Sequence, residues 1–329
     1  MAVITFHFQK AQIIMARINI PKMEDYSSQG HLDQNVNHLN IHWDIVTICQ
    51  LKCGYCYARN SYGKDWNKIA SKDTIDKVIE ALSRSTLPFN LGLLGGEPTI
   101  APHYNYIIKK IQKLDKFNRV YVTTNGEKDL RTIETDGVAF LFSYHPADCT
   151  SEEQFVQNVK YILDKGGKLK VNILLHPNKK FWAKAQKMAR DIQALGVKIH
   201  PHYVHTKWDR RLYKYKEEAW EFFKEFEDLP RDIEYNDELF NDYEVYKYGL
   251  TKFKGWSCWN NNYEVDVHGN VVKFCKPENT ETSLLLRDLD YFKRIGQIQP
   301  MICPHQECNC DGLLKLKKVR NATADEPSK

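Results

Sequence analysis

Cys49-Gln-Leu-Lys-Cys53-Gly-Tyr-Cys56 places three thiols in one short stretch, directly after an apolar run that is typical of a strand. Thiolates favour iron–sulfur clusters, zinc or copper(I). A structural zinc site takes four ligands, but the next histidine is His103 and no fourth cysteine follows closely. Three ligands on a cubane cluster leave one iron open to a small molecule. The stretch therefore predicts a metal site that performs chemistry.

Outward from this loop, apolar strand-like runs alternate with amphipathic helical segments as far as residue 205. This alternation is typical of parallel β/α units. Six strands are expected, at residues 41–47, 90–94, 119–123, 138–143, 169–175 and 197–203. Six units are too few for a closed eight-fold barrel, so the predicted α/β fold is a partial (β/α)6 TIM-like barrel. Its site is expected at the carboxyl ends of the strands.

Several helix ends can be predicted from single residues. Ser71 is expected to cap the helix that follows the cysteine loop, and Pro102 is expected in the first turn of the next helix. Ser151 and Gln154 resemble a capping box. Gly196 is a natural stop for the helix before the last strand.

The chain divides into five predicted parts. They are an N-terminal segment (1–40), the barrel (41–206), a helical bridge (207–254), an extension with clustered cysteines (255–312) and a disordered basic tail (313–329). The bridge is rich in aromatic residues such as Trp220, Phe222, Phe223 and Phe226, which are expected to pack against the barrel.

Composition excludes several classes of protein. With 42% hydrophobic residues the chain can form a full core, yet no apolar run approaches the roughly 20 residues that span a bilayer. The net charge of +5 is mild and is concentrated only at Lys315–Arg320, so nucleic-acid binding is not expected. Without a signal-peptide core, a cytoplasmic protein is expected, and its clustered cysteines favour metal ligation over disulfides.

The cysteine loop matches the signature of the radical S-adenosylmethionine (SAM) superfamily, including the aromatic Tyr55 before the third cysteine. The resemblance implies that Cys49, Cys53 and Cys56 hold a [4Fe–4S] cluster. Its open iron would bind the amino and carboxylate groups of SAM, and the backbone around Tyr55 would lie against the adenine.

The second strand ends in Gly95-Gly96-Glu97-Pro98, which resembles the family motif that receives the amino group of SAM. Paired glycines permit a close approach of backbone, and a carboxylate suits an ammonium group. Gly95, Gly96 and Glu97 are therefore predicted to bind SAM.

Polar residues also end the third and fourth strands. Thr124, Asn125 and Ser143 are candidates for contacts with SAM, because strand ends that face one cleft suit ribose and carboxylate groups. Asn125-Gly126 is equally typical of a plain turn. Four histidines near later strand ends could line a substrate cavity: His145, His176, His202 and His205.

A second cysteine group lies near the C-terminus. Cys258 and Cys275 flank two strand-like runs joined at His268-Gly269, which predicts a hairpin. Cys303, Cys308 and Cys310 supply three more thiols. Four cysteines around a hairpin also describe a zinc ribbon. The segment resembles the twitch or SPASM extensions of radical SAM enzymes, which implies an auxiliary [4Fe–4S] cluster; which of the last three cysteines ligate it stays open.

The resemblance implies a reaction. An electron donor such as flavodoxin or ferredoxin would reduce the first cluster, SAM would be cleaved to a 5'-deoxyadenosyl radical, and this radical would abstract hydrogen from a substrate C–H. Oxidative modification of a peptide or protein side chain is the predicted outcome. Residues 1–40 are too few for the usual peptide-recognition module, so a small-molecule dehydrogenase or cyclase is the alternative. RNA modification and a non-catalytic zinc-binding protein are further alternatives.

Overall fold

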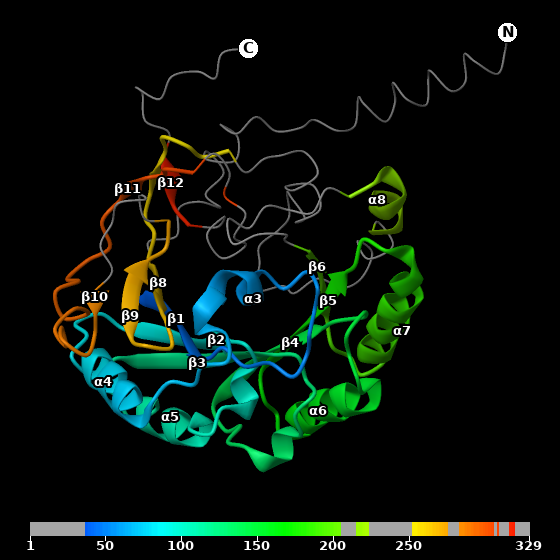
Figure 1. The fold of residues 1–329 in the computed structure, drawn as a ribbon, viewed down its shortest axis with the longest axis horizontal. Coiled ribbons are helices and arrows are strands. Elements are labelled where there is room, and N and C mark those ends of the chain that lie inside the picture. Colours follow the sequence, from blue (N-terminus) through cyan, green and yellow to red (C-terminus); the bar gives the residue numbers. More distant parts are fainter. Residues whose placement is uncertain are drawn as a thin grey trace, which may run out of the picture.

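The computed structural model describes residues 37–204, 215–223, 252–275, 283–305, 308 and 316–319. A nine-stranded sheet organises these residues, in the order β10-β9-β8-β1-β2-β3-β4-β5-β6 (Figure 1). Neighbouring strands from β1 to β6 are all parallel. The α/β class and the partial barrel are confirmed.

The six parallel strands match the six predicted from the apolar runs to within two residues at each end. They are β1 (Leu39–Val46), β2 (Phe89–Gly95), β3 (Phe117–Thr124), β4 (Val138–Tyr144), β5 (Leu169–Leu175) and β6 (Ile199–Tyr203). The helices are α3 (Tyr57–Tyr62), α4 (Lys72–Ser83), α5 (Tyr104–Ile111), α6 (Glu152–Asp164), α7 (Trp182–Gln193) and α8 (Glu217–Phe223). Helices α4 to α7 cover one side of the sheet, whereas α3 lies on the other side (Figure 1).

The two faces of the sheet differ in chemistry because side chains alternate along each strand. On β1, Ile41, Trp43 and Ile45 are at most 1% exposed and belong to the core. Between them, His42 and Asp44 point to the opposite face. The core therefore lies between the sheet and helices α4 to α7, and the other face carries polar side chains.

Helix ends largely follow the local signals. Ser71 Oγ accepts a hydrogen bond from Thr74 N at 3.0 Å, so this predicted cap is confirmed. Pro102 was predicted in the first turn of α5, but it precedes the helix, which begins at Tyr104 with His103 as its N-cap. The helix begins later because the N–H of Tyr104 is still bonded to the carbonyl of Ala101 in a turn that precedes it.

The predicted capping box of α6 forms only in part. Ser151 Oγ accepts from Gln154 N at 3.1 Å, as the box requires. The Gln154 amide donates instead to Asn158 Oδ1 at 3.2 Å. Asn158 is buried and its own amide donates to the carbonyls of Gly126 and Lys128, so Gln154 supports a tertiary contact in place of the box.

The predicted C-terminal hairpin is present as β8 (Asn262–Val265) and β9 (Asn270–Lys273). It does not stand apart from the barrel, because β8 pairs in parallel with β1 and extends the same sheet. A partial barrel leaves an edge of its first strand open, and pairing satisfies the backbone groups there. The remaining short strands are β10 (Ser283–Leu284), next to β9, and a separate sheet of β7 (Ser257–Cys258), β11 (Met301–Ile302) and β12 (Lys318–Val319).

The aromatic residues of the predicted bridge are described only in part. Trp182 of α7 stacks on Phe222 of α8 at 4.4 Å between ring centroids, and Trp220 contacts Tyr203 of β6 at 5.5 Å. The expected packing of Trp220 and Phe222 against the barrel is thus observed. The side chain of Phe223, the residue Phe226, the predicted tail from residue 320 onward and the segment 1–36 lie outside the described residues.

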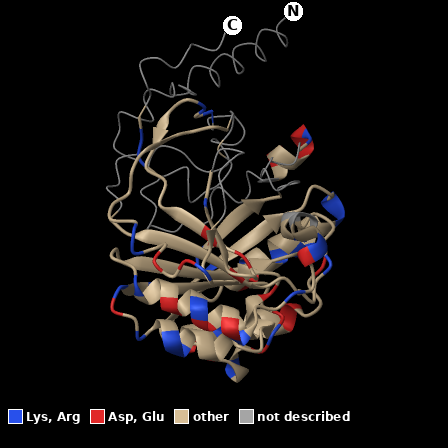
Figure 2. Cartoon of the chain, turned by 60° about the vertical axis from the view of Figure 1, so that its left-hand side comes forward, with Lys and Arg blue, Asp and Glu red and all other residues tan. Residues whose placement is uncertain are grey.

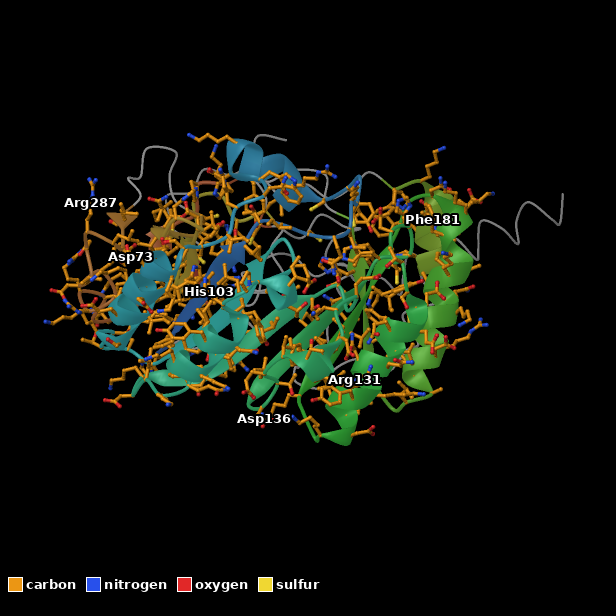
Figure 3. All side chains as sticks on the ribbon, turned by 60° about the horizontal axis from the view of Figure 1, so that its bottom comes forward. Asp73, His103, Arg131, Asp136, Phe181 and Arg287 are labelled. Carbon is orange, nitrogen blue, oxygen red and sulfur yellow. The ribbon has the colours of Figure 1, made fainter. Side chains whose placement is uncertain are left out.

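The surface carries mixed charge. Lys, Arg, Asp and Glu alternate along the outer helices (Figure 2), with ion pairs such as Lys187–Asp191 at 2.6 Å. Figure 3 shows Arg131 and Asp136 on the outer rim beside the helices. Exposed pairs of this kind contribute little to stability. Within the described part of the chain, no helix has the length and apolar character needed to cross a membrane.

Candidate active site

The three cysteines of the first group lie in the loop between β1 and α3. Cys53 is buried, whereas Cys49 and Cys56 are half-buried. The loop is compact, because Cys56 N donates to the carbonyl of Cys53 at 3.1 Å and the Cys56 thiol is the N-cap of α3. In the described residues, no three Cys, His, Asp or Glu side chains converge closely enough to hold a metal ion.

Each sulfur of the loop has a nitrogen close to it. The pairs are Asn125 Nδ2 with Cys49 Sγ at 3.6 Å, His145 Nδ1 with Cys53 Sγ at 3.6 Å and Arg59 N with Cys56 Sγ at 3.4 Å. Hydrogen bonds to sulfur tune the potential of an iron–sulfur cluster. Burial raises the pKa of Cys49 to about 11 and raises the pKa of Cys53 further. Cys49 and Cys53 therefore hold their protons at neutral pH, and binding of metal would release them. This donor set fits an iron–sulfur cluster.

The glycine pair at the end of β2 packs against the backbone at the end of β1 and at the start of the cysteine loop. Gly95 has φ +117°, and a Cβ there would lie 1.9 Å from the carbonyl oxygen of Val46. A Cβ on Gly96 would lie 2.0 Å from the carbonyl oxygen of Ile48. Gly96 N donates to Val46 O at 2.7 Å. The close approach that glycine permits is thus made to the loop that carries the cysteines.

Glu97 occupies the centre of this arrangement. Its side chain is 1% exposed and accepts hydrogen bonds from Thr99 Oγ1 at 2.6 Å, Thr124 Oγ1 at 2.8 Å and Asn125 N at 2.7 Å. Burial raises the pKa of Glu97, while these donors favour its ionised form. In this structure Glu97 and Thr124 join the ends of β2 and β3, and their predicted contacts with SAM stay predictions.

Asn125 links three elements of the site. Besides its contact with Cys49, its Oδ1 accepts from Gln50 Nε2 at 3.1 Å and from Glu127 N at 3.0 Å. Asn125 thus forms a turn and also contacts the cysteine loop, and its predicted contact with SAM stays a prediction. Ser143 lies on the polar face of β4, in register with Asn172 of β5.

Tyr55 lies among the predicted histidines. Its hydroxyl is 3.0 Å from His145 Nδ1, the two rings stack at 5.9 Å, and His176 meets the Tyr55 ring edge-on at 5.4 Å. Burial, followed by the charge of His202, lowers the pKa of His145 to about 4. His145 is therefore neutral at physiological pH. His205 lies outside the described residues.

Asp148 was missed from the sequence. Its Oδ2 is buried without a hydrogen-bond partner in the described chain. Its charge raises the pKa of both Cys53 and Tyr55, after the larger effect of burial. The sequence offered one indication that Asp148 belongs to the site: it lies three residues after His145, beyond the end of the fourth strand.

Two lysines lie close enough to the second cysteine group for their charges to act on its thiols. Cys258 lies in the central strand β7, and Cys303 follows β11, which pairs with β7. Both thiols are buried, which raises the pKa of each, and the charge of Lys318 acts in the opposite direction on both. Burial lowers the pKa of Lys273, while Cys258 and Cys275 oppose this shift. Buried ammonium groups need anionic partners, so this donor set suits thiolates.

The three other predicted thiols of this group are less defined. Cys308 is buried, and Cys310 lies outside the described residues. Cys275 follows β9 with φ +56°, a backbone conformation that few residues other than glycine adopt. The choice among Cys303, Cys308 and Cys310 stays open.

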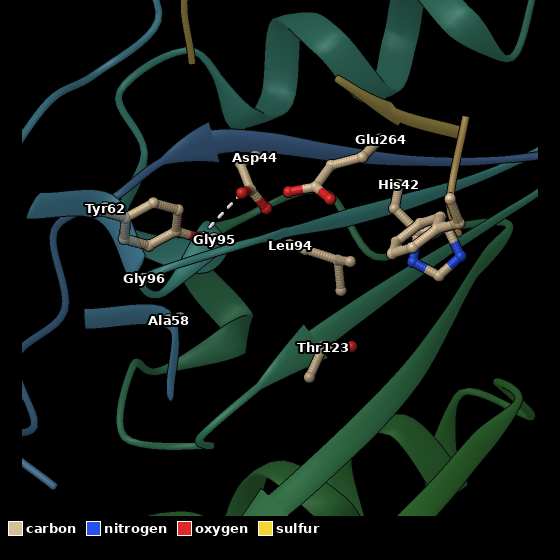
Figure 4. A pocket seen from close by; sticks show the side chains of 10 residues that line it. His42, Asp44, Ala58, Tyr62, Leu94, Gly95, Gly96, Thr123 and Glu264 are labelled. Carbon is tan, nitrogen blue, oxygen red and sulfur yellow. Dashed lines mark hydrogen bonds between the residues drawn. The ribbon is translucent and has the colours of Figure 1, made fainter. Parts of the chain in front are cut away.

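A cavity of about 110 Å³ adjoins the glycine pair on the polar face of the sheet (Figure 4). Its walls include Asp44 of β1, Thr123 of β3, Tyr62 of α3 and Glu264 of β8. Neither acidic residue was predicted from the sequence. A charged residue inside the apolar run of β1 was the one available signal for Asp44.

Comparison with known proteins agrees with this arrangement. Residues 43–136 match the family model of the radical SAM superfamily. The chain is 30% identical over 150 residues to a GTP 3',8-cyclase of Mannheimia succiniciproducens, covering 41% of this chain and 44% of that protein. It is 30% identical over 94 residues to a GTP 3',8-cyclase of Clostridium acetobutylicum, covering 28% of each. The chain thus spans less than half the length of these curated relatives.

Two solved structures share the fold. One is native anSMEcpe with bound AdoMet, with TM-score 0.54 and 13% identity over 79% of this chain and 83% of that chain. The other is Streptococcus suis SuiB bound to S-adenosylmethionine, with TM-score 0.51 and 15% identity over 88% of this chain and 77% of that chain. Since the family model matches the stretch that holds the cysteine loop, residues 43–136 form a radical SAM domain, and the chain is an enzyme.

Proposed function

We propose that the enzyme cleaves SAM reductively and oxidises a side chain of a peptide or protein substrate. The observation that carries this proposal is the cysteine loop itself, in which each of three thiols has a nitrogen within 3.6 Å, beside a glycine turn at the strand ends. A [4Fe–4S] cluster held by Cys49, Cys53 and Cys56 would supply the electron that splits SAM into methionine and a 5'-deoxyadenosyl radical, which takes a hydrogen atom from the substrate.

The residues of the chain have supporting tasks in this reaction. Asn125 and the glycine pair hold the cysteine loop in place, and Glu97 joins the strand ends behind it. The polar face of the sheet would bind SAM, with Ser143 and the backbone around Tyr55 as its contacts. The hairpin β8–β9 borders the cavity through Glu264, which would help to exclude water from the radical.

Two observations support peptide modification: solved structures of the same fold contain bound peptides, and the chain has a second cysteine group. One solved structure of this fold is described as anSMEcpe with a Cp18Cys peptide, and another as SuiB with the precursor peptide SuiA. An auxiliary [4Fe–4S] cluster on Cys258, Cys275, Cys303 and a fourth thiol could accept the electron that an oxidised substrate releases. A donor such as flavodoxin or ferredoxin would supply the first electron in the cytoplasm.

A small-molecule substrate is the second candidate. It is favoured by the 30% identity to two GTP 3',8-cyclases, which covers less than half of this chain in either case. The two candidates differ in which compound is consumed together with SAM. Incubation with GTP under reducing conditions, with GTP loss followed by chromatography, separates them, since a peptide-modifying enzyme would leave GTP unchanged.

Anaerobic reconstitution tests the proposed function. We expect brown protein with about eight irons per chain, as two cubanes require, and formation of 5'-deoxyadenosine from SAM under dithionite. Iron analysis and chromatography of the nucleoside provide the measurements. Colourless protein with stoichiometric zinc and no SAM cleavage would defeat the proposal.

Replacement of Cys275 by Ala is expected to separate the two clusters. Cys275 follows the hairpin and, like Cys258, lies close enough to Lys273 to affect its pKa. The Cys275→Ala protein should lose about four irons, keep reductive SAM cleavage and lose substrate turnover. Iron content, 5'-deoxyadenosine and product are measured on the same preparation. Loss of all iron would show that the two sites are not independent.

A further inference from the structure

Asp148 lies beside the cysteine loop, and the proposed reaction gives it no task. It belongs to the turn after β4, in which its backbone N–H donates to the carbonyl of His145 at 3.0 Å. Its Oδ2 is buried and has no hydrogen-bond partner in the described chain. A carboxylate oxygen in this situation is costly. Buried groups left without a partner are rare, and a redox or catalytic role is one reason for them.

The carboxylate of Asp148 acts on Cys53. Burial raises the pKa of the Cys53 thiol, and the charge of Asp148 and a hydrogen bond between the two side chains raise it further. In that bond the thiol donates and the carboxylate accepts. Asp148 is therefore close to a sulfur that would become a ligand of the first cluster. When the thiol loses its proton on binding metal, this bond is lost and two like charges remain next to each other.

Tyr55 acts on the same sulfur in the opposite direction. Its hydroxyl forms a hydrogen bond with Cys53, which opposes the effects of burial and of Asp148 on the pKa of that thiol. His145 Nδ1 lies 3.0 Å from the Tyr55 hydroxyl, and the two rings stack, so His145 holds the hydroxyl beside the sulfur. A donor stabilises a thiolate, whereas a carboxylate destabilises it. One ligand of the first cluster is thus subject to two opposing influences.

These influences bear on the ease of reduction. Charge, hydrogen bonds to sulfur and solvent exposure set the potential of an iron–sulfur cluster. Reduction adds negative charge, so a nearby carboxylate makes it less favourable and a nearby donor makes it more favourable. A lower potential gives a stronger reductant, which reductive cleavage of SAM needs. We propose that Asp148 keeps the potential of the first cluster low by placing a carboxylate next to Cys53.

This inference deepens the proposed function and rests on it, because it takes Cys53 as a ligand of the cluster that cleaves SAM. Asp148 acts through Cys53 in this role. If Asp148 served only to shape the turn after β4, an amide of the same size would replace it without any effect on the potential.

Redox titrations test the role of the charge. The potential is measured by electron paramagnetic resonance on reconstituted protein without SAM, from the signal that Cys53→Ala lacks. Asp148→Asn should raise the potential. At the wild-type midpoint, the ratio of reduced to oxidised cluster should then increase at least about tenfold, which is about 59 mV for one electron. Asp148→Glu restores a carboxylate and should return the potential toward the wild-type value.

Two further variants separate charge from distortion of the loop. Tyr55→Phe removes a donor to the same sulfur and should shift the potential in the direction opposite to that of Asp148→Asn. Asp115→Asn makes the same chemical change at an exposed carboxylate before β3, at the end of the strands away from the cysteine loop. Asp115→Asn should leave the potential unchanged.

The outcomes distinguish this inference from the proposed function. An Asp148→Asn protein with the wild-type potential would overturn the inference. Loss of the first cluster from Asp148→Asn would also overturn it, since Asp148 would then be needed to hold the cluster. Iron content and SAM cleavage are measured on the same samples. Wild-type protein that cleaves SAM, with no shift in Asp148→Asn, would leave the proposed function and refute the role of Asp148, and wild-type protein without the first cluster would refute both.

Discussion

Replacement of Cys53 by Ala is expected to abolish reductive cleavage of SAM. Cys53 is the central and most buried thiol of the loop, and two thiolates cannot hold the first cluster in place. The iron content should fall from about eight to about four per chain, and 5'-deoxyadenosine should fall below detection under dithionite. Iron analysis and nucleoside chromatography on anaerobically reconstituted protein provide the measurements.

Cys149 offers a matched control for this change. It is a half-buried thiol in the loop after β4 and belongs to neither cysteine group. Cys149→Ala removes the same atoms and should keep both the iron and the cleavage of SAM. If Cys53→Ala cleaved SAM as well as Cys149→Ala does, the loop would not be the site of the reaction.

Replacement of Gly96 by Ala is expected to displace the cysteine loop by a clash with its backbone. The new Cβ would lie 2.0 Å from the carbonyl oxygen and 2.4 Å from the carbonyl carbon of Ile48, next to Cys49. Both are backbone atoms and cannot rotate away, so the cysteine loop must move. We expect a loss of at least about 1–3 kcal/mol in the free energy of unfolding, together with loss of the first cluster. Urea unfolding and iron analysis measure the two effects.

Gly54 is the matched control, since it lies within the cysteine loop itself. A Cβ at Gly54 would meet no atom within 4 Å, and its φ is not in the left-handed region. Gly54→Ala should therefore unfold at the wild-type urea concentration and keep both clusters. Equal behaviour of the two variants would mean that the tight packing of Gly96 on Ile48 has no role in holding the loop.

Much of the fold was predictable because it depends on local pattern. The strands follow from short apolar runs, whose side chains meet the helices on one face of the sheet. Ser71 could be recognised as a cap because its hydroxyl bonds a backbone N–H only three residues away. The capping box at Ser151 was wrong in its second half because Gln154 bonds to Asn158, which in turn holds the distant turn at Gly126.

The site was predictable only where its residues are close in sequence. Cys49, Cys53 and Cys56 are contiguous enough for spacing alone to indicate a common ligand role. The predicted contact of Thr124 with SAM stays a prediction. In the structure its hydroxyl donates to Glu97, whereas Thr123 lines the cavity, because neighbouring residues of a strand point to opposite faces. Polarity at a strand end does not reveal which residue points inward.

The sequence by itself determined the class of the fold and the two groups of clustered thiols, and it predicted a metal site at the first of them, since each depends on spacing within a short segment. The tertiary structure alone decided that β8 joins the sheet beside β1 and so places Glu264 against Asp44. It also decided that Glu97 accepts hydrogen bonds from Thr124 and Asn125 at the end of β3. Both outcomes depend on pairing between segments far apart in the chain, and no local pattern encodes that pairing.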